Sequence, residues 1–256
     1  MKILGVIPAR MAASRFPDKP MAKLMGMPMI GHCYFRSCMC DLLDEVYVAT
    51  CDQVIVDYVE SIGGKAVMTS DVHERASERT AEALINVENI LNQGEFDLVV
   101  LIQGDEPLIH PEMITEVIEP LLDGSRQVSN LMMTLTTEEE INNSNNVKVV
   151  VSNKGNALYM SREAIPSSKK FKGEMEVYRQ LGLIAFTRKA LLDFVNLEMT
   201  KLEIIESVDM NRFIENEIPI FMRLTNHDAD SVDTPEDLIR VDKKMAEDSL
   251  FEKYKL

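Results

Sequence analysis

Short apolar runs alternate with helical patterns over the first hundred residues, and this alternation restricts the possible folds more than any other feature of the chain. The runs predicted to be buried strands are residues 3–7, 45–50, 66–68 and 98–102. Helical patterns between them open at residues 28–30 and cover 54–62 and 78–91. Strands and helices that alternate at this spacing predict right-handed βαβ units and a parallel sheet.

The first predicted strand leads into a basic loop. It stops at Pro8, which has no N–H for a central ladder, and the loop that follows carries Arg10, Arg15 and Lys19 among small residues. The chain as a whole has a formal net charge of −15, so a positive loop stands out. A surface loop that is basic by chance is the alternative. Backbone N–H groups and fixed cations at the carboxyl end of a strand predict a polyphosphate site.

Two aspartates are candidates for a metal site. Gly104 and Asp105 follow the carboxyl end of the strand over 98–102, and ligands of doubly wound sheets bind at such ends. Asp105 could instead cap the helix after Pro111. Asp233 lies just outside the predicted Thr234 cap of the last helix, so capping does not explain it. Because Mg²⁺ takes one or two carboxylates and completes its shell with water and phosphate oxygens, the pair predicts a magnesium site.

Arg79 lies at the end of a polar segment, residues 69–79, that leads into the third helix. Ser77 is the predicted N-cap of this helix. A cation in the first turn is opposed by the helix dipole, which is easier to explain if Arg79 faces an anionic ligand. A solvated arginine remains the alternative.

In the second half of the chain the predicted strands and helices no longer alternate one by one. A polar, lysine-rich loop over 167–176 is predicted to be mobile or to contact a partner. Strands are predicted at 127–136, 147–151, 157–160, 177–186 and 218–224, and helices at 111–122, 189–194, 202–216 and from Pro235 onward.

Composition excludes several classes of protein. With 46% hydrophobic and 27% charged residues, the 256-residue chain is typical of a globular protein, and its acidity argues against nucleic-acid or membrane binding. No apolar run reaches the length of a membrane span, and the N-terminus does not match a signal peptide. The spacing of Cys38 and Cys40 does not suit zinc, so the four cysteines are predicted to be reduced thiols in a cytoplasmic protein.

The motifs together resemble those of the sugar-acid cytidylyltransferases, in particular the CMP-Kdo synthetase (3-deoxy-manno-octulosonate cytidylyltransferase) family. The matching segments are IPARMAASRFPDKP, VYVATCD, QGDEPLI, VKVVVS, ALYMSREAIP and VDTPEDL. The resemblance implies an α/β, Rossmann-like nucleotidyltransferase fold with a mixed, mostly parallel sheet, helices on both faces and a smaller hairpin or dimerisation extension. It implies one domain over 1–256, in which residues 145–190 contribute an acceptor and dimerisation subregion.

The same resemblance implies a reaction and its residues. The expected reaction is Mg²⁺-dependent transfer of CMP from CTP to the anomeric hydroxyl of Kdo or a Kdo-like sugar acid, with release of pyrophosphate, in a homodimer that serves lipopolysaccharide or capsule synthesis. Lys19, Arg10 and Asp105 are the expected catalytic residues, and Asp105 and Asp233 the metal ligands. The expected nucleotide-binding residues are Pro8, Ala9, Arg10, Arg15, Lys19, Arg79 and Gln103, and the expected acceptor-binding residues are Arg162, Gln180 and Asp209.

Departures from the family pattern fall mostly on the acceptor side. Gln180 replaces a histidine, Ile184 a tyrosine, and residues 209–212 a Glu-Gln-Leu-Arg segment, whereas residues 76–79 replace Gly-Thr-Asp-Arg. They favour an acceptor other than plain Kdo, such as an amino-substituted 3-deoxy sugar acid. The alternatives are a nonulosonic or other acid, a nucleotide with another base, and a non-catalytic homologue that only binds nucleotide.

Overall fold

The computed structural model describes residues 1–12, 16–173 and 175–255, which form two compact units. The first unit consists of residues 1–115 and 228–256, and the second of residues 116–227. The predicted subregion at 145–190 therefore lies within the second unit. Within the described ranges, no helix is both long enough and apolar enough to span a membrane.

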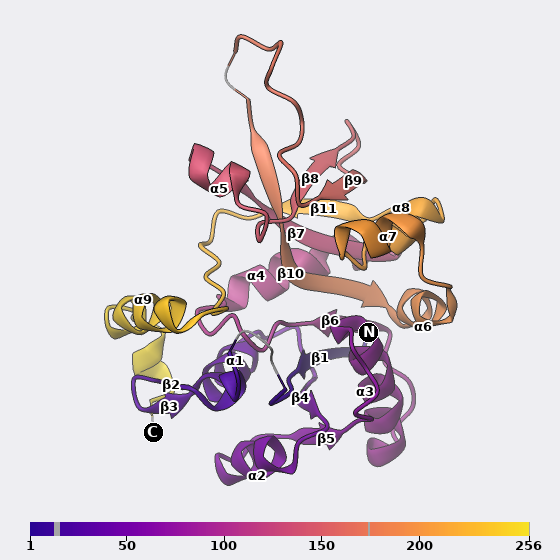
Figure 1. The fold of residues 1–256 in the computed structure, drawn as a ribbon. Coiled ribbons are helices and arrows are strands. Elements are labelled where there is room, and N and C mark those ends of the chain that lie inside the picture. Colours follow the sequence, from indigo (N-terminus) through magenta and orange to yellow (C-terminus); the bar gives the residue numbers. More distant parts are fainter. Residues whose placement is uncertain (13–15, 174, 256) are drawn as a thin grey trace. The chain divides into compact units, whose positions relative to one another are not determined.

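A parallel sheet forms the centre of the first unit. Its strands lie in the order β6-β1-β4-β5, and β1 pairs in parallel with both β4 and β6. Helices α1 and α2 lie on one side of this sheet and α3 on the other (Figure 1). The elements are β1 (Ile3–Pro8), η1 (Lys19–Met21), β2 (Lys23–Leu24), β3 (Met27–Pro28), α1 (Met29–Ser37), β4 (Glu45–Thr50), α2 (Gln53–Ser61), β5 (Ala66–Met68), α3 (Ala76–Leu91), β6 (Leu98–Leu101), α9 (Pro235–Ala246) and η3 (Phe251–Lys253).

The second unit is built around β10, a long strand that pairs in antiparallel fashion with β7 and with β8. β11 pairs in parallel with β7, and β9 pairs in antiparallel fashion with β8. Helix α4 (Pro111–Ile118) leads the chain into this unit. Its other elements are η2 (Glu119–Leu121), β7 (Val128–Leu135), α5 (Glu138–Asn142), β8 (Lys148–Val151), β9 (Ala157–Ser161), β10 (Val177–Thr187), α6 (Arg188–Asn196), α7 (Lys201–Glu206), α8 (Asn211–Glu215) and β11 (Phe221–Leu224).

The predicted α/β class, with parallel and antiparallel strand pairs, is confirmed by these pairings. One helix start was predicted wrongly. Helix α3 begins at Ala76 with Arg75 as its N-cap, so Ser77 is not the cap. The backbone is extended at Arg75 and helical directly after it, which places Ser77 in the first turn, where it is fully buried.

The helix predicted over residues 202–216 is wrong, because the chain forms α7 and α8 with a turn between them. Ser207 has a φ of 52°, a left-handed conformation that ends α7. The turn allows Arg212 to reach back to Glu203 in a buried two-pronged ion pair, with N–O distances of 2.8 and 2.6 Å. In a continuous helix these residues would be about 13 Å apart along the axis. Burial of both charged groups requires this pairing, so the pair favours the broken helix.

A hydrogen-bonded chain attaches the C-terminal segment to α1. The buried His32 ring lies with Nε2 2.9 Å from the carbonyl oxygen of Leu24, so Nε2 carries the hydrogen and Nδ1 accepts from the Tyr254 hydroxyl at 3.0 Å. Arg36 Nε donates to the same hydroxyl at 2.8 Å, and its Nη2 pairs with Asp248. Burial lowers the pKa of His32, an effect to which the nearby positive charge of Arg36 adds. The folded chain therefore favours neutral His32.

We expect this histidine to make stability depend on pH. The unfolded chain takes up a proton near the ordinary histidine pKa of about 6.5, whereas the folded chain binds it less readily. The stabilisation is thus present above that pH and is lost progressively as the pH falls below it. Urea denaturation at about pH 7.5 and about pH 5.5 should show a larger loss of unfolding free energy for the wild-type chain than for His32→Gln, which keeps a donor for Leu24. Equal losses would contradict this account.

Candidate functional site

A pocket of about 280 Å³ lies in the first unit, at the carboxyl ends of its parallel strands. The loop after β1 forms one wall, the residues after β6 a second, and the loop that enters α3 a third, while Asp233 comes from the segment before α9. The lining residues are Pro8, Ala9, Arg10, Ala12, Phe16, Lys19, Pro20, His73, Glu74, Arg75, Ala76, Arg79, Gln103, Gly104, Asp105 and Asp233. The pocket lies where an α/β sheet binds its ligands.

Lys19 brings the two predicted metal ligands together. Its Nζ lies 2.6 Å from Asp105 Oδ2 and 3.5 Å from Asp233 Oδ1. Lys19 is the first residue of η1, and its side chain is 15% exposed, against 29% for Asp105 and 31% for Asp233. The backbone N–H of Val232 donates to the carbonyl oxygen of Asp105 at 2.9 Å, which ties the two aspartate segments together. Two carboxylates thus share one ammonium group.

The loop after β1 is fixed at both ends by its backbone. Ala9 N–H donates to the Ala49 carbonyl at 2.9 Å, and Met11 N–H donates to the Asp52 carboxylate at 2.8 Å. Asp18 N–H donates back to the Met11 carbonyl at 3.2 Å. Arg10 is exposed at the pocket, whereas predicted nucleotide-binding residue Arg15 lies outside the described residues.

The wall formed by the residues after β6 lies against the wall formed by the loop after β1. A Cβ atom on Gly104 would lie 2.9 Å from the carbonyl oxygen of Pro8, closer than side chains tolerate. Gly104 therefore permits the approach of the two backbones, and it places Gln103 and Asp105 along the pocket.

Arg79 is buried and bound mainly to the loop before α3. Its Nη1 donates to Thr69 Oγ1 at 2.5 Å and to the Ser70 carbonyl at 3.1 Å, and its Nη2 donates to the His73 carbonyl at 3.4 Å. Arg79 is thus not a solvated surface residue, and it also lines the pocket. That it contacts an anionic ligand stays a prediction.

The third wall contains pocket residues that the sequence did not single out: His73, Glu74 and Arg75. His73 pairs with Glu82, which also accepts hydrogen bonds from the Ser70 backbone. Partial burial opposes ionisation of Glu82, but the bonds from Ser70 and His73 outweigh it and lower its pKa. Their place in the sequence could have indicated that they line the pocket, because this loop follows β5, a parallel strand of the same sheet.

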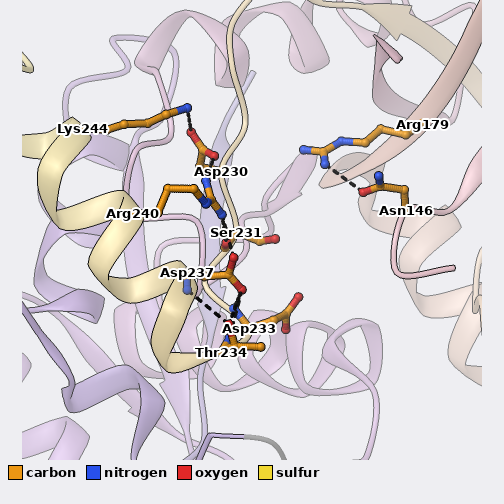
Figure 2. Close-up of polar contacts among 9 residues, drawn as sticks. All are labelled: Asn146, Arg179, Asp230, Ser231, Asp233, Thr234, Asp237, Arg240 and Lys244. Carbon is orange, nitrogen blue, oxygen red and sulfur yellow. Dashed lines mark hydrogen bonds and ion pairs between the residues drawn. The ribbon is translucent and has the colours of Figure 1, made fainter. Parts of the chain in front are cut away.

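Asp233 is held in place by the start of α9. Asp237 Oδ2 accepts from the backbone N–H of Asp233 at 3.2 Å and from the N–H and hydroxyl of Thr234 at 3.1 and 3.0 Å (Figure 2). Burial of the Asp237 carboxyl opposes its ionisation, yet the hydrogen bonds from Arg240 and Thr234 lower its pKa. The predicted Thr234 cap is confirmed, and Asp237 completes a capping box.

The predicted acceptor-binding residues lie in the second unit. The Arg162 guanidinium donates to the carbonyl oxygens of Ser144, Glu206 and Ser207 at 2.8–3.2 Å. These bonds bring Arg162 to the end of α7, close in sequence to Asp209. Gln180 on β10 donates to Asn130 Oδ1 at 2.8 Å, beside a bulge in the strand. Their roles toward an acceptor stay predictions.

The donor set at Lys19 fits a hard divalent cation better than zinc. Among the described residues, no group of three or more histidine, cysteine, aspartate or glutamate side chains is arranged to hold a metal. Asp105 and Asp233 offer two carboxylates that already face one cationic group. Two protein carboxylates, with water and phosphate oxygens for the remaining positions, suit Mg²⁺.

Comparison with known proteins decides the family. The sequence model described as "Cytidylyltransferase" matches residues 4–223. The chain belongs to the cytidylyltransferase family. A relative from Thermodesulfovibrio yellowstonii, named 3-deoxy-manno-octulosonate cytidylyltransferase, is 40% identical over 93% of this chain and 96% of the relative. One from Shewanella piezotolerans, named 8-amino-3,8-dideoxy-manno-octulosonate cytidylyltransferase, is 39% identical over 97% of this chain and 100% of the relative.

A solved structure extends this similarity to three dimensions. It is that of CMP:2-keto-3-deoxy-manno-octonic acid synthetase complexed with CTP, with a TM-score of 0.87 and 31% identity over 96% of this chain and 99% of the other. The resemblance predicted from the motifs, the Rossmann-like nucleotidyltransferase fold and the enzyme class are thereby confirmed. The dimerisation extension stays a prediction.

We expect Lys19→Met to lower the rate of cytidylyl transfer much more than the affinity for nucleotide, if its ammonium group has the predicted catalytic role of stabilising charge that develops in the transition state. Loss of one such group costs about 100-fold or more in kcat. Lys23→Met removes an exposed lysine four positions later and should leave kcat unchanged. Steady-state kinetics with measured nucleotide affinity would check this, and near-normal turnover by Lys19→Met would refute the assignment.

Proposed function

We propose that this cytidylyltransferase transfers CMP from CTP to the anomeric hydroxyl of a 3-deoxy sugar acid and releases pyrophosphate. The observation that carries the proposal is the Lys19 ammonium group between Asp105 and Asp233, at a pocket lined by the basic loop after β1. The names of the relatives and the CTP in the related structure support the choice of nucleotide and acceptor.

The reaction needs no covalent intermediate on the protein. The anomeric oxygen forms a bond to the α-phosphorus of CTP as the bond from that phosphorus to the bridging oxygen breaks. Pyrophosphate carries away the electron pair of the broken bond, and the hydroxyl proton passes to solvent. In this scheme Arg10 and Lys19 stabilise the charge that grows on the phosphoryl oxygens and on pyrophosphate.

Asp105 and Asp233 are the residues that would hold Mg²⁺. When bound, this ion would lower the pKa of the attacking hydroxyl and screen the charge of the triphosphate. The backbone of Pro8 and Ala9 would contact the cytosine side, and Gln103 would lie along the nucleoside. Arg79 would hold the loop before α3 against the nucleotide through its bonds to Thr69 and Ser70.

A second candidate acceptor is an 8-amino 3-deoxy sugar acid. It is favoured by Ile184, a buried apolar residue where the family has a tyrosine, and by Gln180, whose amide donates to Asn130. Loss of hydrogen-bonding groups weakens selection for the hydroxyl that they would meet. The relative from Shewanella piezotolerans bears the name of an enzyme for such an acid.

An acceptor panel would test both candidates. With CTP and Mg²⁺, we expect pyrophosphate release with 3-deoxy-octulosonic acids and none with a nonulosonic acid, because the similar proteins are named for octulosonic acids. Turnover of Kdo alone would exclude the 8-amino acceptor. Nucleotide-dependent thermal stabilisation without turnover of any acid would indicate a non-catalytic homologue.

The choice of base needs a separate comparison. CTP should raise the melting temperature more than UTP, GTP or ATP at equal concentration, because only the preferred ligand binds the folded chain tightly. Chelation of divalent ions should abolish pyrophosphate release, and added Mg²⁺ should restore it. Equal stabilisation by all four nucleotides would contradict selection for cytosine.

The remaining predictions concern assembly and location. We propose a homodimer, supported by exposed apolar side chains on the second unit, among them Ile204 and Ile205 on α7. A molar mass near 29.0 kDa, that of one chain, in light scattering would contradict this. A role in the cytoplasm, in lipopolysaccharide or capsule synthesis, belongs to the same proposal.

A further inference from the structure

The segment that carries Asp233 has little secondary structure of its own. It runs from β11 to α9 and is fixed through side chains and single backbone bonds. Val232 is fully buried against Leu24, Met29, Val241 and Met245, and its N–H donates to the Asp105 carbonyl. These contacts fix Val232. They do not set the path of the backbone before and after it, and so they do not orient Asp233.

Arg240 connects the residues before Asp233 with those after it. Its Nη1 pairs with Asp230 and its Nη2 donates to Asp237 Oδ1 at 2.8 Å, with a long contact of 3.5 Å to the Ser231 carbonyl (Figure 2). The other oxygen of Asp237 accepts from the backbone of Asp233 and Thr234. Asp233 therefore lies in the sequence between Asp230 and Asp237, whose carboxylates share one guanidinium group; we call this arrangement the bracket.

The planar fork of an arginine suits the contacts to Asp230 and Asp237. A guanidinium group is planar and presents donors in a fixed fork, so it can hold two carboxylates at a set separation, whereas an ammonium group acts as a point charge. Lys244 provides the contrast, because among the described residues its Nζ pairs with one carboxylate, that of Asp230, at 2.6 Å. The two cations have nearly equal exposure, 45% for Arg240 and 47% for Lys244, so solvent screening affects them alike.

We propose that Arg240 is a positioning residue for Asp233: by holding Asp230 and Asp237, it sets the Asp233 carboxylate beside Asp105 and Lys19. The proposal rests on the proposed function, in which Asp233 holds the divalent cation. Arg240 is not among the residues that line the pocket, so we assign it no direct contact with substrate or metal. Residues that orient metal ligands in this way affect metal affinity more than they affect the fold.

Manganese binding measured by electron paramagnetic resonance, with CTP present, tests the proposal without relying on turnover. We expect Arg240→Met to weaken Mn²⁺ affinity about 10-fold, a typical effect of losing a residue that supports a metal ligand. Arg240→Lys should weaken it as well, because lysine lacks the fork. Lys244→Met, the matched control, should bind Mn²⁺ as the wild type does, and CTP affinity in the absence of metal should be unchanged in all variants.

A second readout separates positioning from a general loss of structure. The Mg²⁺ concentration for half-maximal turnover should rise in Arg240→Met, whereas the KM for the sugar acid and the melting temperature should stay close to those of Lys244→Met. If Arg240→Met does not fold, Arg240→Lys and Asp230→Asn carry the same comparison. Equal weakening of Mn²⁺ binding by Lys244→Met would overturn the proposal, since Lys244 reaches only one side of Asp233.

The outcome also distinguishes the two proposals. If the wild-type protein with CTP binds Mn²⁺ and releases pyrophosphate, but Arg240→Met and Arg240→Lys bind Mn²⁺ with unchanged affinity, the positioning role is wrong and the proposed function stands. If the wild-type protein with CTP does not bind Mn²⁺, both proposals fail.

Discussion

The contact of one ammonium group with two carboxylates is the interaction on which the site depends. Asp105 follows β6 and Asp233 precedes α9, and these segments are far apart in the sequence. Two partly buried carboxylates that approach one another repel, and a cation that contacts both offsets this repulsion. Lys19 supplies that cation at 2.6 and 3.5 Å. The loop after β1 must therefore take the path that brings Lys19 to this point, which in turn defines the pocket.

Much of the first unit could be predicted from the sequence, because its signals are local. Short apolar runs marked β1, β4, β5 and β6, and Thr234 with Pro235 marked the start of α9. Asp105 and Asp233 could be singled out because the first closely follows the carboxyl end of a strand and the second is not needed for capping. The roles of the lining residues toward nucleotide and metal remain predictions.

The features that could not be predicted depend on contacts between distant residues. The break between α7 and α8 follows the buried pair of Glu203 and Arg212, and periodicity alone gives no sign of such a pair. The start of α3 at Ala76 reflects the extended backbone at Arg75 rather than a capping side chain. His73, which lines the pocket and pairs with Glu82, lies in a polar loop that matches no general motif. In each case the missing information was tertiary.

The close approach at Gly104 has a consequence for how this pocket can change. β1 and β6 are paired strands, and a side chain at position 104 would meet the Pro8 carbonyl, so a larger residue there would require the two backbones to move apart. The third wall is free of this contact, so we expect the pocket to tolerate substitutions more readily there, at Glu74, Arg75 and Ala76. Of the departures from the family pattern described above, Ala76 lies on that wall, whereas Gln103, Gly104 and Asp105 belong to the matching segment QGDEPLI on the wall after β6.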